Sequence, residues 1–356
     1  MYLRVEKLKK ILDDKKIDAL IIKSKNNKRY IGALTGSGVY ILLTKYKSYQ
    51  ILDGRYIDEA NKSTTGFENK VVNQGSYILT IIELLKELSI QKIGIETQAM
   101  SIKEYIDLSN HDFDIELITN ELSKVRTVKS KEEIEIIKKA CEITDEVFKE
   151  VISEIKEGMT ELEVSALLHY WVLKKGASGM AFEPIVVSGE RGAMPHGRPT
   201  TKKLKRNEAI TIDFGVVYKG YQSDMTRTIS IGEPAKLIKD IYKAVLKAQM
   251  LAIEGIKAGV SARSIDKIAR DSITKSGFGE YFTHGLGHGM GLGDGELPTL
   301  NSKSEDILEE GMVMSCEPGI YIPDIGGVRI EDDIVIINGK GVSLNKTSKE
   351  WIILGD

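Results

Sequence analysis

Two aspartates lie in a segment, residues 211–228, whose pattern predicts a β-hairpin. If Lys219-Gly220 forms its two-residue turn, Asp213 pairs with Thr226, and Asp224 lies diagonally across from Asp213. Neighbours of this kind share one face and lie within reach of each other's side chains. Two buried carboxylates repel each other, and a shared cation would remove that cost. The alternative is that one aspartate caps a turn while the other is solvated.

The segment His284–Leu292 has glycine at every other position and two histidines four residues apart. This pattern predicts a strand in which His284 and His288 face the same side, with glycines that let a ligand or another backbone come close. His196 lies in a separate turn that is rich in glycine and proline. A single histidine is more often structural than a ligand, but a cluster in glycine-rich strands favours a site.

Further charged residues interrupt apolar segments near the C-terminus. Glu317 precedes a proline at the end of an apolar run, and Arg329, Glu331 and Asp333 alternate along a strand rich in Val and Ile. Taken singly, each fits ordinary arginine–carboxylate pairing. Taken together, two aspartates, one histidine and two glutamates, all on predicted strands, make an oxygen-rich ligand set. Such a set suits Mn²⁺, Co²⁺ or Fe²⁺ better than a structural zinc, and two metals sharing carboxylates need about this many ligands.

The elements that must position these residues form two similar halves. A capping box at Ser130 and Glu133 begins a long amphipathic helix that Gly158 is expected to end. Second helices are expected over 162–174 and 264–275, each after a longer helix and each before a strand-rich segment. This repeat predicts a pseudo-twofold domain whose sheet is covered by helices on one side.

The N-terminal part of the chain predicts a separate α/β domain, because apolar runs alternate with helix-like stretches such as 78–88. The apolar runs, expected as strands, are 19–22, 39–43, 49–52, 92–95 and 115–118. The expected organisation is an N-terminal domain over 1–121, a polar linker over 122–129 and a second domain over 130–356. Asp53–Tyr56 is interpreted as a turn, and the N-terminal domain shows no catalytic constellation.

Composition narrows the possible partners and location. The 356 residues carry a formal net charge of −2, which argues against nucleic acid as the main partner. Two cysteines cannot make a disulfide framework, so a reducing cytoplasm fits. The N-terminus predicts a charged amphipathic helix and not a signal peptide, and no apolar run approaches the ~20 residues that a membrane span needs.

Six motifs, in order, resemble those of the pita-bread metallopeptidases, and the whole chain is similar to their Xaa-Pro branch, prolidase and aminopeptidase P. The motifs are Ser188–Gly197, Thr211–Gly215, Ser223–Arg227, His284–Gly289, Glu317–Tyr321 and Val328–Asp332. Their order and spacing are specific as a set. The resemblance implies an α+β architecture, in which a pita-bread domain of curved antiparallel sheet and helices follows a smaller creatinase/prolidase-type α/β domain.

The resemblance also implies a dinuclear metal site, with Mn²⁺ expected first and Co²⁺, Fe²⁺ or Zn²⁺ as alternatives. Its ligands would be Asp213, Asp224, His288, Glu317 and Glu331. A hydroxide bridging the metals would attack the Xaa-Pro bond, and Glu317 would shuttle the proton to the proline nitrogen. His196 and His284 would contact the substrate, and Arg329 would orient either a ligand carboxylate or the charge of the substrate. The substrate would be a dipeptide or short peptide with proline second, and the family implies a homodimer.

One position departs from the family pattern. A second histidine normally follows the metal histidine in the segment that here is Gly291–Pro298, and Gly295 stands in its place. A hydrogen-bond donor to the transition state can be worth ~3 kcal/mol. Asp294 or His284 could substitute, the activity could be weak, or the substrate could differ. The alternatives to an Xaa-Pro peptidase are therefore a non-catalytic protein that binds proline peptides and a hydrolase of another amide.

Overall fold

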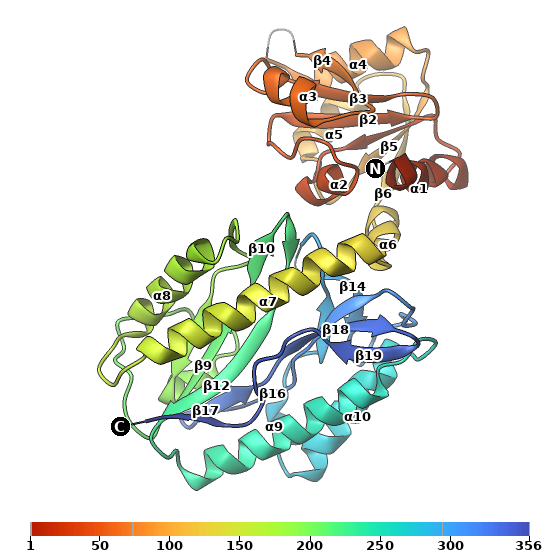
Figure 1. The fold of residues 1–356 in the computed structure, drawn as a ribbon. Coiled ribbons are helices and arrows are strands. Elements are labelled where there is room, and N and C mark those ends of the chain that lie inside the picture. Colours follow the sequence, from red (N-terminus) through yellow and green to blue (C-terminus); the bar gives the residue numbers. More distant parts are fainter. Residues whose placement is uncertain (1, 73–74, 294, 356) are drawn as a thin grey trace. The chain divides into compact units, whose positions relative to one another are not determined.

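The computed structural model describes residues 2–72, 75–293 and 295–355. The chain divides into two compact units, Met1–Arg126 and Thr127–Asp356, which Figure 1 shows in red to yellow and in yellow to blue. The boundary falls inside a helix, α6 (Glu121–Thr127), so most of the segment expected as a polar linker, 122–129, is helical. No helix among the described residues is long and apolar enough to cross a membrane.

The N-terminal unit contains one six-stranded mixed sheet with strand order β4-β3-β2-β1-β5-β6. Its strands are β1 Ala19–Ile22, β2 Val39–Thr44, β3 Ser48–Leu52, β4 Glu68–Val71, β5 Lys92–Glu96 and β6 Asp114–Ile118. Its helices before α6 are α1 Tyr2–Asp14, α2 Lys25–Tyr30, α3 Ile57–Ser63, α4 Tyr77–Glu87 and α5 Ile102–Ser109. All five predicted strands are confirmed. The sequence missed β4, an edge strand whose residues are mostly solvent-accessible and carry no apolar signal.

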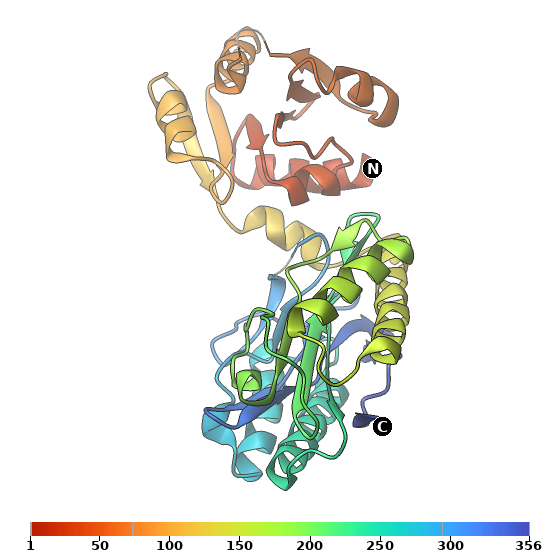
Figure 2. The same ribbon diagram turned by 90° about the vertical axis from the view of Figure 1, so that its left-hand side faces the viewer.

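The C-terminal unit has two pairs of helices, as the repeat predicted. The first pair is α7 Lys131–Glu154 and α8 Glu161–Lys174, and the second is α9 Lys236–Gly255 and α10 Ala262–Lys275. The predicted capping box at Ser130 and Glu133 is present at the start of α7. This helix ends at Glu154, before the position of Gly158. Figures 1 and 2 show each pair packed side by side against its own group of strands.

The strands of this unit form several short sheets. The first half contributes β7 Gly179–Met180, β8 Ile185–Ser188, β9 Ala209–Phe214, β10 Val216–Tyr218, β11 Tyr221–Gln222 and β12 Met225–Ile231. The second half contributes β13 Gly287–Gly289, β14 Glu296–Leu300, β15 Val313–Cys316, β16 Gly319–Ile322, β17 Gly326–Arg329, β18 Asp332–Ile337, β19 Lys340–Ser343 and β20 Ile352–Leu354. Two of these sheets carry the site. One is four-stranded, with order β20-β12-β9-β8, and the other is five-stranded, with order β14-β13-β15-β18-β19.

Two apolar cores hold the helices on these sheets. One is formed by α7 and α8 with β8, β9 and β12, and the other by α9 and α10 with the strands after β13. Along the helices and strands of these cores, apolar residues recur on the side that packs against the neighbouring layer.

The hairpin that carries the two aspartates has the predicted register. Lys219 and Gly220 form its turn with positive φ angles of 47° and 88°, as a two-residue hairpin turn requires. Asp213 pairs with Thr226 across β9 and β12, which confirms the expected neighbours. The same register runs through the turn, where Tyr218 pairs with Tyr221. The two aspartates therefore lie on one face.

Other strand predictions were wrong in extent. Of the predicted strand 284–292, only Gly287–Gly289 is a strand. The expectation that all five ligand candidates lie on strands was also wrong: Asp224 lies between β11 and β12, Glu317 just after β15, and Glu331 between β17 and β18. The physical reason is that β17 pairs with β16 while β18 pairs with β15, so the chain changes sheet at Glu331.

Candidate metal centre

All the predicted site residues line one cavity of about 520 Å³ in the C-terminal unit. They are Asp213, Asp224, His288, Glu317 and Glu331, with His196, His284 and Arg329. Further lining residues include Phe182, Glu183, Arg198, Thr299 and Asn301. A larger groove of about 850 Å³ lies along α9 and β19, but it is lined mainly by lysines and apolar residues and contains none of the predicted site residues.

Three carboxylates form the buried centre of the cavity. Oxygens of Asp213, Asp224 and Glu331 all lie within 4.8 Å of one another. One oxygen of each, Oδ1, Oδ1 and Oε1 respectively, is buried and has no hydrogen-bond partner among the described residues. Burial and the neighbouring carboxylates raise the pKa of Asp224 and of Glu331 well above their ordinary values. Unpartnered, mutually repelling oxygens at this spacing fit a bound divalent cation, which would neutralise them.

His288 and Glu317 extend this group toward the open part of the cavity. The Nε2 atom of His288 lies 3.5 Å from Glu317 Oε1 and 3.9 Å from Asp224 Oδ2. The Nδ1 atom lies 3.1 Å from the carbonyl oxygen of Gly289. A carbonyl can only accept, so Nδ1 carries the proton and Nε2 keeps its lone pair for a ligand. This is the tautomer that a metal-binding histidine needs.

Arg329 supports the carboxylate cluster through hydrogen bonds. The guanidinium is buried and donates to Asp213 Oδ2 at 2.5 Å, Thr226 Oγ1 at 3.1 Å and Tyr321 Oη at 2.9 Å. A further N–H donates to the carbonyl of Pro195 at 3.2 Å. Its donors are therefore directed at protein acceptors, and it holds Asp213 in place. The sequence offers two roles for Arg329, orienting a ligand carboxylate or orienting substrate charge, and its contact with Asp213 corresponds to the first.

The two other histidines differ in their partners. The ring of His284 is held on both sides, because Nδ1 lies 2.7 Å from the carbonyl of Gly285 and Nε2 lies 2.9 Å from Tyr321 Oη. Burial lowers the pKa of His284, so its neutral form is favoured. His196 lines the same cavity and is exposed. Of these two histidines, His196 is therefore the more accessible to a ligand in the cavity.

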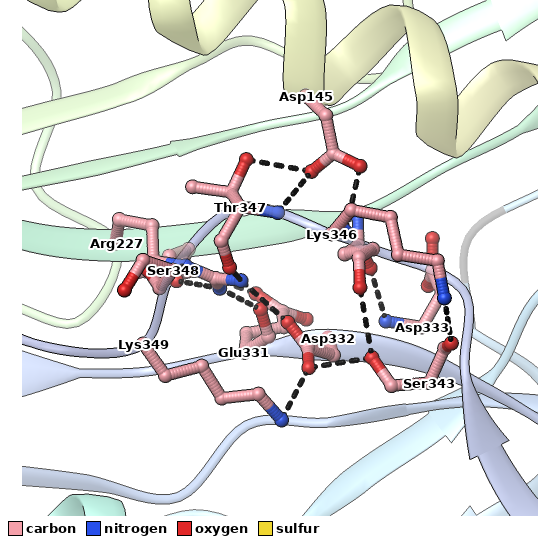
Figure 3. Close-up of polar contacts among 12 residues, drawn as sticks. Asp145, Arg227, Glu331, Asp332, Asp333, Ser343, Lys346, Thr347, Ser348 and Lys349 are labelled. Atoms are coloured by element: carbon pink, nitrogen blue, oxygen red, sulfur yellow. Dashed lines mark hydrogen bonds and ion pairs between the residues drawn. The ribbon is translucent and has the colours of Figure 1, made fainter.

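A second group of buried charges lies on the other side of β18, beside the C-terminal segment (Figure 3). Asp332 accepts from Arg227 at 2.7 Å, Ser343 at 2.7 Å and Lys349 at 2.6 Å, so both carboxylate oxygens are paired. Arg227 also donates to carbonyl oxygens of the same segment, those of Thr347 and Ser348. These partners make the Asp332 group a structural ion-pair network.

Gly295 is not among the described residues that line the cavity. The residue is exposed with φ of +66°, and a Cβ built on it would meet no atom within 4 Å. Space is therefore available for a side chain, but the backbone conformation is one that favours glycine. Asp294, considered above as a substitute for the missing histidine, lies outside the described residues.

Several residues that support the ligands were missed by the sequence reasoning. Thr226 Oγ1 donates to Glu331 Oε2 at 2.6 Å, and the backbone N–H of Asp224 donates to Asp333 Oδ2 at 2.8 Å. Ser315 and Tyr321 make comparable contacts to Glu317 and His284. Thr226 was visible as the cross-strand partner of Asp213. The roles of the others depend on contacts between segments far apart in the sequence.

Comparison with known families accounts for both units. Residues 4–128 match the Creatinase/Prolidase N-terminal domain, and residues 135–338 match Metallopeptidase family M24. The second match covers more than half of the chain. The two matches confirm the predicted order, a creatinase/prolidase-type domain followed by a pita-bread domain.

Full-length relatives give the same result. The chain is 39% identical over 358 residues to the Xaa-Pro dipeptidase of Pyrococcus furiosus, with 98% of this chain and 99% of that protein covered. Its structure resembles that of an Xaa-Pro dipeptidase from Bacillus anthracis with a TM-score of 0.94 at 40% identity, covering 99% of both chains. An X-Pro aminopeptidase from Thermotoga maritima gives 0.91 at 36%, covering 98% and 99%. By these matches and by its cluster of ligand-type side chains, the chain belongs to metallopeptidase family M24.

Proposed function

We propose that this protein is a metal-dependent peptidase that hydrolyses the Xaa-Pro bond at the N-terminus of dipeptides or short peptides. The observation that carries the proposal is the cavity that His288 and Glu317 share with buried carboxylate oxygens, which have no hydrogen-bond partner within residues 2–72, 75–293 and 295–355. The names of the relatives from Pyrococcus furiosus and Bacillus anthracis support the substrate class. A cavity of about 520 Å³ is large enough for a dipeptide or a short peptide end.

The proposed cofactor is a pair of divalent metal ions, with Mn²⁺ as the first candidate and Co²⁺, Fe²⁺ and Zn²⁺ as alternatives. The ligands would be Asp213, Asp224, His288, Glu317 and Glu331. Four carboxylates and one imidazole form a hard, oxygen-rich set of the kind that suits Mn²⁺. When bound, such ions lower the pKa of a water molecule and polarise the carbonyl of the scissile bond.

The protein residues supply positions and proton transfer. Glu317, at the border between the buried cluster and the open cavity, would accept a proton and pass it to the proline nitrogen. His196, whose side chain is exposed in the cavity, would donate a hydrogen bond to the substrate carbonyl as negative charge develops there. His284 would keep its ring fixed between Gly285 and Tyr321 and shape the wall of the cavity. Arg329 would hold Asp213.

The alternative proposal is a non-catalytic member of the family that binds proline peptides. Two observations favour this alternative. Gly295 replaces a histidine that is usual in the family, and both ring nitrogens of His284 already have hydrogen-bond partners within the protein. We also propose a homodimer in the cytoplasm, with the domain limits 1–121 and 130–356 given above. The family resemblance supports the dimer, and two buried free cysteines fit a reducing compartment.

The test is to incubate the Mn²⁺-loaded protein with an Xaa-Pro dipeptide and an Xaa-Pro-Yaa tripeptide and to identify products by mass spectrometry. Cleavage of the dipeptide alone indicates a prolidase, and release of the first residue from the tripeptide indicates an aminopeptidase P. An Asp213→Asn variant is the control and should leave both peptides intact. Stoichiometric binding of the peptides without turnover would instead support the binding protein.

A further inference from the structure

Ser315 connects two of the proposed metal ligands. Its hydroxyl oxygen accepts the backbone N–H of His288 at 3.0 Å and lies 2.9 Å from Glu317 Oε1. The residue lies on β15 and is fully buried. Glu317 Oε1 is the same oxygen that lies 3.5 Å from His288 Nε2. One hydroxyl therefore contacts the backbone of one ligand and the carboxylate of the other.

The direction of these two hydrogen bonds is fixed by chemistry. A serine hydroxyl has one hydrogen to donate, and a backbone N–H can only donate. Because His288 N–H points at the Ser315 oxygen, the hydroxyl hydrogen is free to point at Glu317 Oε1. That oxygen accepts the bond, so the hydroxyl of Ser315 fixes the orientation of the Glu317 side chain.

The backbone segments around Gly287 and Ser315 lie close together. A Cβ on Gly287 would lie 2.2 Å from the Ser315 carbonyl oxygen and 2.8 Å from its hydroxyl, so any side chain there would push β13 and β15 apart. Backbone bonds on both sides, Met290 N–H to Val313 O at 2.9 Å and Glu317 N–H to Leu286 O at 2.8 Å, lock the two segments together. The hydroxyl thus sits in a rigid setting, as groups that orient metal ligands do.

We propose that Ser315 is a positioning residue of the metal centre: it fixes the Glu317 carboxylate relative to His288 so that both ligands face the same ion. This inference rests on the proposed metal site but does not depend on which peptide is cleaved. Removal of the hydroxyl would leave the His288 N–H and Glu317 Oε1 without their partner.

The experiment measures Mn²⁺ affinity by isothermal titration calorimetry of the metal-free full-length protein and three variants. Ser315→Ala removes the hydroxyl, Ser315→Thr keeps it, and Ser343→Ala is a matched control. Ser343 also donates to a carboxylate, Asp332, which is not a proposed ligand. We expect Ser315→Ala to bind Mn²⁺ roughly 10- to 100-fold more weakly than the wild type, with the other two variants near the wild type. Circular dichroism and the Tm of each metal-free variant verify folding.

A second readout is kinetic, at saturating Mn²⁺. Ser315→Ala should lower kcat more than it raises KM, since a misplaced Glu317 affects proton transfer and not peptide binding. The inference is overturned if Ser315→Ala binds Mn²⁺ like the wild type, or if Ser315→Thr is as weak as Ser315→Ala. If the wild type binds no Mn²⁺, the proposed metal centre fails as well. If it binds Mn²⁺ and cleaves no peptide, the proposed function fails while the calorimetric series still supports the role of Ser315.

Discussion

Two neighbouring residues, Glu331 and Asp332, are both buried carboxylates, yet their surroundings are opposite. Asp332 has both oxygens paired with Arg227, Ser343 and Lys349 (Figure 3). Glu331 lies among other carboxylates, and one of its buried oxygens has no hydrogen-bond partner in the part of the chain that the structure describes. The difference separates a structural charge, which the protein itself neutralises, from a functional one, which requires a cation from outside.

The largest effect is expected from Glu331→Gln. The amide keeps the shape of the side chain but removes a proposed metal ligand. Substitution of a residue that only orients a ligand typically costs up to roughly 100-fold, so turnover of Xaa-Pro peptides should fall by more than that. The metal-free protein should be no less stable, because the repulsion that raises the pKa of Glu331 is relieved. Enzyme assays and the Tm of the metal-free protein measure both effects. Retained activity would show that Glu331 is not a required metal ligand.

The converse change is Asp332→Asn. It leaves Arg227 and Lys349 facing a neutral group in a buried network, which should lower the free energy of unfolding by about 3–5 kcal/mol. Urea denaturation measures this loss. The control is Asp271→Asn, which removes an exposed pair with Lys267 and should cost no more than about 1 kcal/mol. Equal effects of the two variants would show that the Asp332 network is not structural.

The same distinction applies to the histidines. His196→Ala removes an exposed imidazole that lines the cavity and should lower kcat by about 100-fold if it donates to the transition state. His284→Ala removes a ring bonded to Gly285 and Tyr321, so its main effect should be a lower Tm and a smaller loss of kcat. Steady-state kinetics and thermal denaturation of the pair separate the two roles. A larger kcat loss for His284→Ala would reverse our assignment.

The pH dependence of stability provides a further test of the buried carboxylates. Burial raises the pKa of Asp333 to about 8, whereas an unfolded aspartate titrates at roughly 3.9. Between these values the folded protein holds a proton that the unfolded chain has lost. The stability of the metal-free protein should therefore fall as pH rises from about 4 to about 8, by up to about 1.4 kcal/mol per pH unit for this proton. In Asp333→Asn the slope, measured by urea denaturation, should be shallower; an unchanged slope would argue against a raised pKa.

How far the sequence could predict the site depended on the kind of signal. The turn at Lys219-Gly220 set the register of Asp213 and Asp224, because a two-residue hairpin leaves no freedom in pairing. The alternating glycines of 284–292 suggest a long strand, but they are needed because neighbouring backbone lies too close for a side chain. A Cβ on Gly287 or Gly289 would collide with the backbone of Ser315 or Leu297.

Contacts between distant segments were beyond the sequence. Arg329 and Asp213 are 116 residues apart, and only the fold shows that the guanidinium is used for Asp213. Ser315 carried no sequence signal, since its importance comes from the close approach of β13. The alternation of Arg329, Glu331 and Asp333 was visible, but not that the chain changes sheet between them.

The most direct test of the central claim is an anomalous diffraction map from crystals soaked in MnCl₂. We predict peaks beside the unpartnered oxygens of Asp213, Asp224 and Glu331, within bonding distance of His288 or Glu317, and none beside Asp332. A map with no peak at these oxygens, or with Mn²⁺ bound at the Asp332 network instead, would contradict the account.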